Sequence, residues 1–214
     1  MNATLQKLEQ FGIVPVVVLD DAADAAPLAK ALCDGGLACA EVTFRTAAAE
    51  ESIRIMTTEY PDMVVGAGTV LTTDQVDRAI AAGAKFIVST GLDPNIVTYC
   101  IEKNIPITPG VVTPSEIAKA IELGLDVVKF FPAEPSGGLA MIKAVAAPYN
   151  KLRFMPTGGI NAKNALPYLQ YDKIIACGGS WMVKSDLIKE GKFDEITALT
   201  KEAVSLVRSA REVK

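Results

Sequence analysis

The residue with the strongest chemical implication is Lys129, in the middle of the run Asp126-Val-Val-Lys-Phe-Phe-Pro132. This run predicts a fully buried β-strand, and lysine is rarely buried without a partner, because an ammonium group is costly to remove from water. Burial of a lysine favours its neutral amine, which can act as a base or as a nucleophile that forms a Schiff base. In the alternative, structural interpretation, Lys129 lies at a strand end and either extends to solvent or meets a carboxylate.

A second predicted strand carries charged residues at alternate positions. In Ala40-Glu-Val-Thr-Phe-Arg45, side chains alternate between faces, so Glu41, Thr43 and Arg45 share one face. The opposite, apolar face must pack against helices, and we therefore expect the polar face to point inward. With Lys129, this predicts three charged side chains directed at one interior, an arrangement typical of functional sites. The alternative is a structural ion pair between Glu41 and Arg45.

Two glycine pairs follow the last two predicted strands, in Pro156-Thr-Gly-Gly159 and Cys177-Gly-Gly-Ser180. Glycine pairs at the ends of the seventh and eighth strands of an α/β barrel hold phosphate through backbone N–H groups, and Ser180 can add a hydroxyl donor. The sequence therefore favours a phosphorylated ligand. Thr69 offers another hydroxyl at the same rim, although a threonine that ends a strand is more often a helix cap.

Short strands rich in Val and Ile, each followed by a segment with helical periodicity, must position these residues. Eight strands are predicted, at 13–19, 40–45, 63–69, 85–90, 105–109, 126–131, 152–157 and 173–177. Eight strand–helix units in 214 residues predict an α/β fold, a (β/α)8 TIM barrel, that forms a single domain over residues 1–214. We expect residues 1–12 to form an N-terminal helical segment and residues 184–214 to form a C-terminal helical segment that covers the barrel.

Local signals agree with this register. Glycines at 36, 83 and 124 follow helical segments, where a left-handed residue is favoured, and Thr113-Pro-Ser-Glu116 predicts a capping box. The competing fold, an open doubly wound sheet, lacks its glycine fingerprint, because Gly66-Ala-Gly68 is followed by Leu71 at the third glycine position.

Composition excludes several classes of function. Half of the residues are hydrophobic and the net charge is −4, so a large core is expected and nucleic acid is a poor candidate partner. The chain has no histidine, which excludes Ser-His and Cys-His nucleophile systems and histidine-based zinc sites. Four cysteines without CxxC spacing indicate core positions in a reducing compartment. The N-terminus resembles neither a signal peptide nor a membrane span, and we expect a soluble, cytoplasmic protein.

The chain also resembles a known family along nearly its whole length, from about Ile13 to the C-terminal helix. The strings that carry the resemblance are Glu41-Val-Thr-Phe-Arg45, Gly66-Ala-Gly-Thr69, Val128-Lys-Phe-Phe-Pro-Ala133, Pro156-Thr-Gly-Gly159 and Gly178-Gly-Ser-Trp181. They resemble the bacterial class I aldolases for 2-keto-3-deoxy-6-phosphogluconate (KDPG) and 4-hydroxy-2-oxoglutarate (KHG). One position departs from the family, because Ser89-Thr-Gly91 stands where Ser-Pro-Gly is usual, and this changes the wall on the pyruvate side.

The resemblance implies a role for each matched residue. Lys129 is the Schiff-base nucleophile and Glu41 is the general acid/base. The substrate carboxylate is bound by Arg45, Thr69 and Thr157, and the phosphate by Gly158, Gly159, Gly179 and Ser180.

The expected reaction is the cleavage of KDPG to pyruvate and glyceraldehyde 3-phosphate, together with cleavage of KHG to pyruvate and glyoxylate. No metal or cofactor is expected, because the iminium formed on lysine accepts the electrons. The alternatives are an aldolase for the galactonate epimer of KDPG and a barrel that binds a phosphorylated metabolite without cleaving it. The expected partners are a phosphorylated keto acid and pyruvate, without nucleic acid or membrane, and the resemblance implies a homotrimer.

Overall fold

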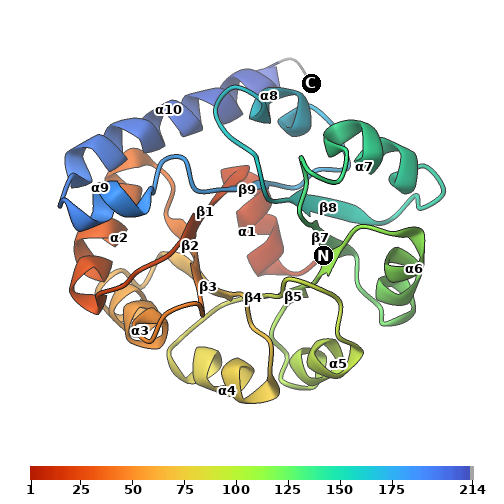
Figure 1. Ribbon diagram of the computed structural model, residues 1–214, viewed down its shortest axis with the longest axis horizontal. Helices are drawn as coiled ribbons and strands as arrows, with labels where there is room; N and C mark the ends of the chain where they lie inside the picture. Colours follow the sequence, from red (N-terminus) through yellow and green to blue (C-terminus); the bar gives the residue numbers. More distant parts are fainter. Residues whose placement is uncertain (213–214) are drawn as a thin grey trace.

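A computed structural model of the chain describes residues 1–212, and in it short parallel strands form a ring that is surrounded by helices (Figure 1). One sheet has the strand order β5-β4-β3-β2-β1-β9, and a second has the order β6-β7-β8. The strands are β1 (Ile13–Val17), β2 (Cys39–Thr43), β3 (Val64–Gly68), β4 (Ile87–Val88), β5 (Ile107–Thr108), β6 (Gly110–Val111), β7 (Val127–Phe130), β8 (Arg153–Pro156) and β9 (Cys177–Gly179). The protein is therefore an α/β fold with a curled parallel sheet.

Two connections bring the sheets together. Isolated parallel bridges pair Phe154 with Ile174 and Thr157 with Gly178, and so join the β8 and β9 segments. Only Pro109 separates β5 from β6. The predicted fifth strand, 105–109, is thus two short strands on either side of a proline, which has no N–H to donate to the ladder. The predicted eighth strand, 173–177, also differs from the structure. The observed strand β9 lies at Cys177–Gly179, so the two ranges share only Cys177.

Helices follow most of the strands and form the outer ring. They are α1 (Ala3–Phe11), α2 (Ala25–Gly35), α3 (Ala49–Glu59), α4 (Thr73–Ala81), α5 (Pro94–Glu102), α6 (Pro114–Glu122), α7 (Gly138–Ala146), α8 (Ala165–Leu169), α9 (Ser185–Lys189) and α10 (Phe193–Glu212), with a short 3-10 helix at Ala22–Asp24. The predicted capping box is confirmed, because the Thr113 hydroxyl accepts from the N–H of Glu116, whose carboxylate accepts from the N–H of Thr113 at 2.8 Å. Helices α9 and α10 occupy the predicted C-terminal segment, whose last two residues, 213–214, lie outside the described residues.

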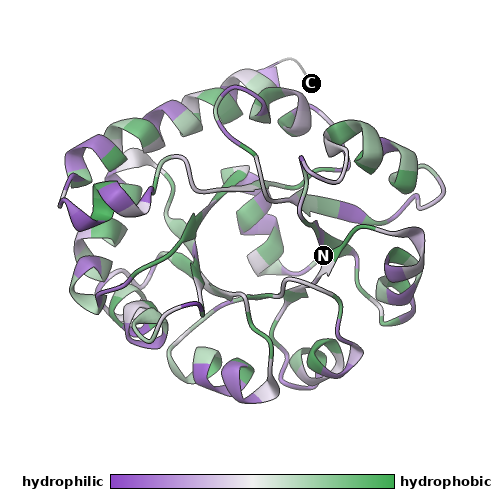
Figure 2. Cartoon of the chain, in the orientation of Figure 1, coloured by the Kyte–Doolittle hydropathy of each residue, from purple (hydrophilic) through white to green (hydrophobic). Residues whose placement is uncertain are grey.

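Burial of apolar side chains between the strands and the helices holds the ring together. Hydrophilic positions gather on the outer helices (Figure 2), while α10 packs along α2 on the outside of β1. Among residues 1–212, no helix is long and apolar enough to cross a membrane.

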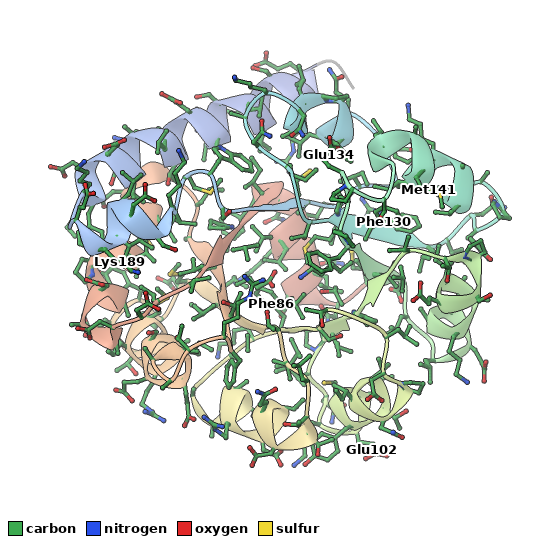
Figure 3. All side chains as sticks on the ribbon, in the orientation of Figure 1. Phe86, Glu102, Phe130, Glu134, Met141 and Lys189 are labelled. Carbon is green, nitrogen blue, oxygen red and sulfur yellow. The ribbon has the colours of Figure 1, made fainter. Side chains whose placement is uncertain are left out.

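Helix α1 closes one end of the ring. Its side chains Leu5 and Leu8 are buried in a separate apolar cluster with Phe86, which lies in the middle of the ring (Figure 3), and with the apolar residues of the strand beginnings. Gly66 makes room for this packing, since a Cβ there would lie 2.4 Å from the Phe86 ring. The N-terminal ammonium forms an ion pair with Asp126 at 2.6 Å, which fixes the start of the helix.

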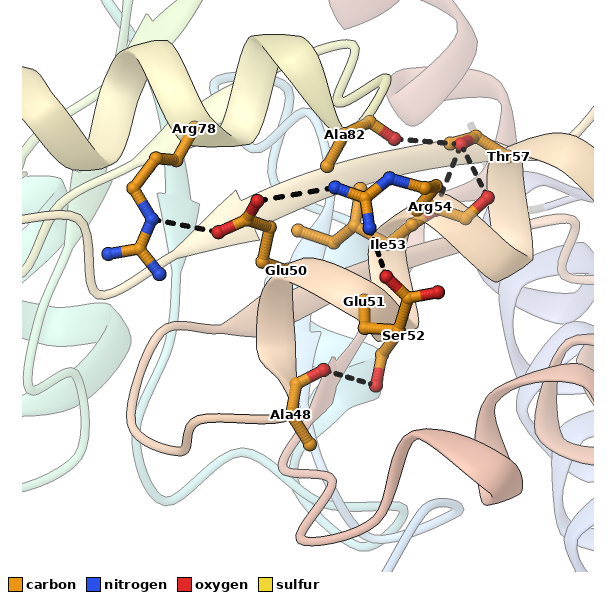
Figure 4. A network of polar contacts seen from close by, with 9 residues as sticks. All are labelled: Ala48, Glu50, Glu51, Ser52, Ile53, Arg54, Thr57, Arg78 and Ala82. Carbon is orange, nitrogen blue, oxygen red and sulfur yellow. Dashed lines mark hydrogen bonds and ion pairs between the residues drawn. The ribbon is translucent and has the colours of Figure 1, made fainter.

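A polar network on the outer surface connects α3 to α4 (Figure 4). Arg78 donates to Glu50 at 2.8 Å, Glu50 also accepts from Arg54, and the Thr57 hydroxyl donates to the carbonyl of Ala82 at 2.9 Å. These ion pairs are largely exposed, and each contributes little to stability. They join the two helices on either side of β3, whose carboxyl end carries Thr69.

Candidate active site

Lys129 lies on β7 with its side chain inside the ring. The residue is 3% exposed, and its Nζ lies 3.5 Å from Oε1 of Glu41 and 4.9 Å from the centre of the Phe131 ring. The alternative in which this lysine extends to solvent is therefore wrong, and its amine meets a carboxylate. The contact is longer than the roughly 2.7–2.9 Å of a close charge-assisted hydrogen bond, so the pair is a loose one.

Glu41 comes from β2 and is fully buried. Its Oε2 is buried with no hydrogen-bond partner among residues 1–212. Gly68 on the neighbouring strand makes room for the carboxylate, because a Cβ there would lie 2.3 Å from Oε1. A buried carboxylate oxygen without a hydrogen-bond partner lowers the stability of the folded state. Such an atom indicates a site where a ligand or a reacting group binds.

Arg45 lies two residues beyond the end of β2 and is exposed, so the alternation of side chains that predicted its inward face does not extend to it. Strand β2 ends at Thr43, whose hydroxyl donates to the carbonyl of Val17 at 3.0 Å, and the chain then turns towards α3. The guanidinium is exposed and forms no ion pair with Glu41.

Thr69 follows β3 in an unusual backbone conformation. Its φ is +57°, a left-handed value that is costly for a β-branched residue. The helix-cap alternative for Thr69 is wrong, since Thr72 caps α4 by accepting from the N–H of Gln75. Strained residues of this kind cluster at binding and catalytic sites, where the surrounding structure holds them in place.

Two buried hydroxyls share the interior with Glu41. The hydroxyls of Thr157 and Thr108 have no hydrogen-bond partner among residues 1–212. A Cβ at Gly178 would lie 2.3 Å from the Thr157 hydroxyl, so this glycine gives it space. The sequence analysis did not identify Thr108. The one feature that could have indicated it is the presence of a polar residue at the end of the apolar run Ile105-Pro-Ile-Thr108.

A pocket of about 490 Å³ opens at the carboxyl ends of the strands. Its lining includes Arg45, Phe131, Thr157, both glycine-rich turns and Ser180, together with Lys184 and Asp186, which sequence reasoning did not single out. Lys129 and Glu41 are not part of this lining. Phe131 contacts both the pocket and the amine, so the buried pair lies directly beside the pocket.

The first glycine-rich turn lines this pocket, and its carbonyl groups bind to the segments behind it. The carbonyls of Thr157 and Gly158 accept from the N–H groups of Ala133 and Glu134, at 2.8 and 3.0 Å. The carbonyl of Gly159 accepts from the side-chain amides of Asn161 and Asn164. In a trans peptide the C=O and the N–H point in opposite directions.

The N–H group of Gly158 faces Gly178 of β9, to which the bridge between Thr157 and Gly178 joins this segment. The N–H groups of residues 159 and 160 point away from the partners of the carbonyls; they have no backbone acceptor among residues 1–212, and their residues line the pocket. Left-handed φ values at Gly158 (+101°) and Gly159 (+82°) make this arrangement accessible. Ser180, after the second glycine pair, is exposed to the same pocket. The result is a group of neutral donors suited to an anion.

Other reactive groups are absent or inert in the described part of the chain. No group of three or more Cys, Asp or Glu side chains within residues 1–212 could hold a metal ion. Burial raises the pKa of the Cys39 and Cys177 thiols, and it raises that of Cys100 to about 12. Thiols with such pKa values are poor nucleophiles at neutral pH.

The model of the KDPG and KHG aldolase family matches residues 4–199. The chain belongs to this family. It is 47% identical over 207 residues to the 2-dehydro-3-deoxy-phosphogluconate aldolase of Treponema pallidum, with 97% of this chain and 99% of the relative covered.

Two solved structures of aldolases are close to this one. The KDPG aldolase of Legionella pneumophila, with pyruvate captured as a covalent carbinolamine intermediate, superposes with a TM-score of 0.91 at 36% identity over 94% of this chain and 98% of that one. The aldolase of Zymomonas mobilis with 3-phosphoglycerate has a TM-score of 0.88 at 42% identity, over 94% and 95% of the two chains.

Proposed function

We propose that this aldolase cleaves KDPG to pyruvate and glyceraldehyde 3-phosphate through a Schiff base on Lys129, and that it also cleaves KHG to pyruvate and glyoxylate. The observation that carries the proposal is the buried Lys129 amine, 3.5 Å from a buried carboxylate that has one unpartnered oxygen. The relatives support it, since one is named for this substrate and another was captured with pyruvate as a carbinolamine.

Formation of the Schiff base uses both members of the buried pair. Lys129 passes a proton to Glu41, and the resulting neutral amine attacks the C2 ketone to give a carbinolamine. Glu41 donates a proton to the departing hydroxyl, so that water leaves and an iminium forms. The loose contact between the two side chains leaves the amine free to approach the ketone.

Cleavage then reverses the direction of proton transfer. Glu41, now a carboxylate, takes the proton from the C4 hydroxyl, the C3–C4 bond breaks, and its electron pair moves into the iminium to give an enamine. The aldehyde product leaves. Protonation of the enamine at C3 by Glu41 and addition of water at C2 release pyruvate and restore the amine.

The remaining residues bind the two ends of the substrate. Arg45, Thr69 and Thr157 bind the carboxylate, for which the planar fork of an arginine is well suited. The phosphate binds to the donors of Gly158, Gly159, Gly179 and Ser180. The unpartnered Thr157 hydroxyl and the free N–H groups of the first turn support these assignments.

We further infer that the described residues form one closed (β/α)8 barrel domain, in which β5 and β6 together are a single interrupted strand. The bridges between β8 and β9 support this closure. We also propose a homotrimer in the cytoplasm, in line with four cysteines that are all free thiols. Light scattering of the purified protein tests the trimer.

Borohydride trapping tests the covalent step. Reduction in the presence of pyruvate should inactivate the protein and add one pyruvate-derived mass to the peptide that contains Lys129. Full activity with an unmodified Lys129 would refute the Schiff base. A parallel assay of pyruvate release from KDPG and from its galactonate epimer distinguishes the two sugar specificities, and trapping without release from either would indicate a protein that binds but does not cleave.

A further inference from the structure

The segment that follows Lys129 along the chain supports the glycine turn from beneath. A Cβ on Gly159 would lie 2.6 Å from Cβ of Glu134, and a Cβ on Gly158 would lie 3.2 Å from Cα of Pro132. The N–H groups of Ala133 and Glu134 donate to two carbonyls of the turn. The conformation of the turn therefore depends on where Glu134 is held.

Glu134 is held by a phenol. The buried hydroxyl of Tyr168, a residue that is 2% exposed, donates a hydrogen bond to the Glu134 carboxylate. Tyr168 comes from α8, the helix that follows the glycine turn in the chain. Gly138 makes room for the pair, since a Cβ there would lie 2.9 Å from both Oε1 of Glu134 and the Tyr168 hydroxyl.

No other side chain within residues 1–212 pairs with this carboxylate. Glu134 is otherwise exposed, and an exposed glutamate without a partner has many accessible rotamers. Burial, followed by the bond to Glu134, raises the pKa of the Tyr168 hydroxyl, which therefore stays protonated and remains a donor. The phenol and the carboxylate thus form a fixed support, and the turn packs on its inner side.

We propose that Glu134 and Tyr168 are positioning residues that hold the turn at Gly158 and Gly159 in the conformation that binds the substrate phosphate. The inference rests on the proposed function of that turn. Neither residue touches the substrate, and both act through the direction of the backbone N–H groups.

The sign of the expected effect separates this role from simple electrostatics. Glu134 carries a negative charge near a proposed phosphate site, so if charge alone mattered its removal would strengthen phosphate binding. If Glu134 instead supports the turn, its removal weakens phosphate binding. Glu134→Ala therefore gives opposite outcomes under the two interpretations.

The test measures steady-state cleavage of KDPG and KHG and inhibition by inorganic phosphate, for Tyr168→Phe and Glu134→Ala. We expect KM for KDPG and the inhibition constant of phosphate to rise roughly tenfold, equivalent to about 1.4 kcal/mol. KM for KHG, which has no phosphate, should stay within about twofold, the scale of a surface substitution. The rate of borohydride trapping with pyruvate should not change.

A matched control is Tyr99→Phe. The Tyr99 hydroxyl donates to Asp77 at 2.7 Å, in a similar phenol–carboxylate pair between α5 and α4, on the opposite side of the ring from α8 (Figure 1). This variant should leave both substrates and phosphate inhibition unchanged.

Several outcomes would overturn the proposal. Equal losses for KDPG and KHG, tighter phosphate inhibition in Glu134→Ala, or parameters like those of the wild type would each do so. If Tyr168→Phe does not fold, the test relies on Glu134→Ala alone, because that substitution changes an exposed side chain. Absence of a pyruvate adduct in the wild type would instead refute the proposed function.

Discussion

The two ends of the strand ring differ in what fills them. At the carboxyl ends of the strands, the interior holds Lys129, Glu41 and the Thr157 hydroxyl, and two of these carry buried atoms without a partner. At the opposite end, Leu8 and Phe86 fill the interior with apolar packing. The comparison indicates that one end supplies stability, which offsets the cost of unpartnered polar groups at the other.

Cavity size does not distinguish the two ends. A cavity of about 510 Å³ lies at the α1 end, between the segments that precede β7 and β8, and it is similar in size to the proposed site. Its charged lining residues are Asp126, which pairs with the N-terminus, and Lys151, which is exposed. Buried groups without partners, rather than volume, identify the reactive end.

The largest expected effect comes from Lys129, beside the proposed site, in comparison with Lys151, which lines the other cavity. Lys129→Met removes the nucleophile and should lower kcat/KM for KDPG by roughly 10³-fold or more, at least about 4 kcal/mol of transition-state stabilisation. Lys151→Met at the other cavity should leave it unchanged. Pyruvate release and borohydride trapping measure both variants, and a trapped adduct in Lys129→Met would place the Schiff base elsewhere.

Apolar packing at the α1 end should affect stability and leave the chemistry intact. Leu8 is fully buried, and Leu8→Ala should lower the free energy of unfolding by about 2–5 kcal/mol through lost burial and a new cavity. Urea unfolding measures the loss. The rate of pyruvate trapping by the folded protein should match that of the wild type, and a parallel loss of trapping would show that the two ends are coupled.

A third comparison uses the two non-glycine residues with positive φ in the described chain. Thr69 (φ +57°) lies at the site and Asn104 (φ +56°) at the α1 end. Thr69→Gly relieves strain and should raise the free energy of unfolding by about 1 kcal/mol, while KM for KDPG rises. Asn104→Gly should change neither by much, because asparagine tolerates this conformation. Thermal unfolding and steady-state kinetics of both variants test these expectations. If Thr69→Gly leaves the kinetics unchanged, the strained conformation of Thr69 has no role in function.

The smallest effect is expected on the outer surface. The hydrogen bond from Arg78 holds the pKa of the Glu50 carboxyl below its ordinary value, so the pair stabilises the fold above the unfolded pKa, about 4.3, and this contribution is lost as the pH falls through the lower folded value. Glu50→Gln should cost only a few tenths of a kcal/mol at pH 7 and nothing in strong acid. Urea unfolding of the wild type and of Glu50→Gln, at pH 7 and in strong acid, tests this expectation. A difference in the free energy of unfolding between the two proteins that grows in acid would contradict it.

Much of the fold and the central pair were predictable from sequence, because they depend on local patterns. The Val-rich runs gave most of the strands, and Glu41 and Lys129 were both found from charge inside such runs. The position of Arg45 was not predictable in the same way, because alternation holds only while a strand continues, and no local signal showed that β2 ends at Thr43. The pair of Glu134 and Tyr168 joins residues that are distant in sequence, so no periodicity could reveal it.

The hydrogen bonds from Ala133 and Glu134 to the glycine turn have a consequence for substrate choice. These donors lie a few residues after Lys129 on the same segment, so the separation between the amine and the anion-binding turn is set by the covalent backbone and two hydrogen bonds. Independent movements of helices therefore change that separation little. Under the proposed assignments, we expect phosphorylated keto acids to be distinguished by the number of bonds between the carbonyl carbon and the phosphate, so that a chain longer or shorter than that of KDPG engages one end at the expense of the other.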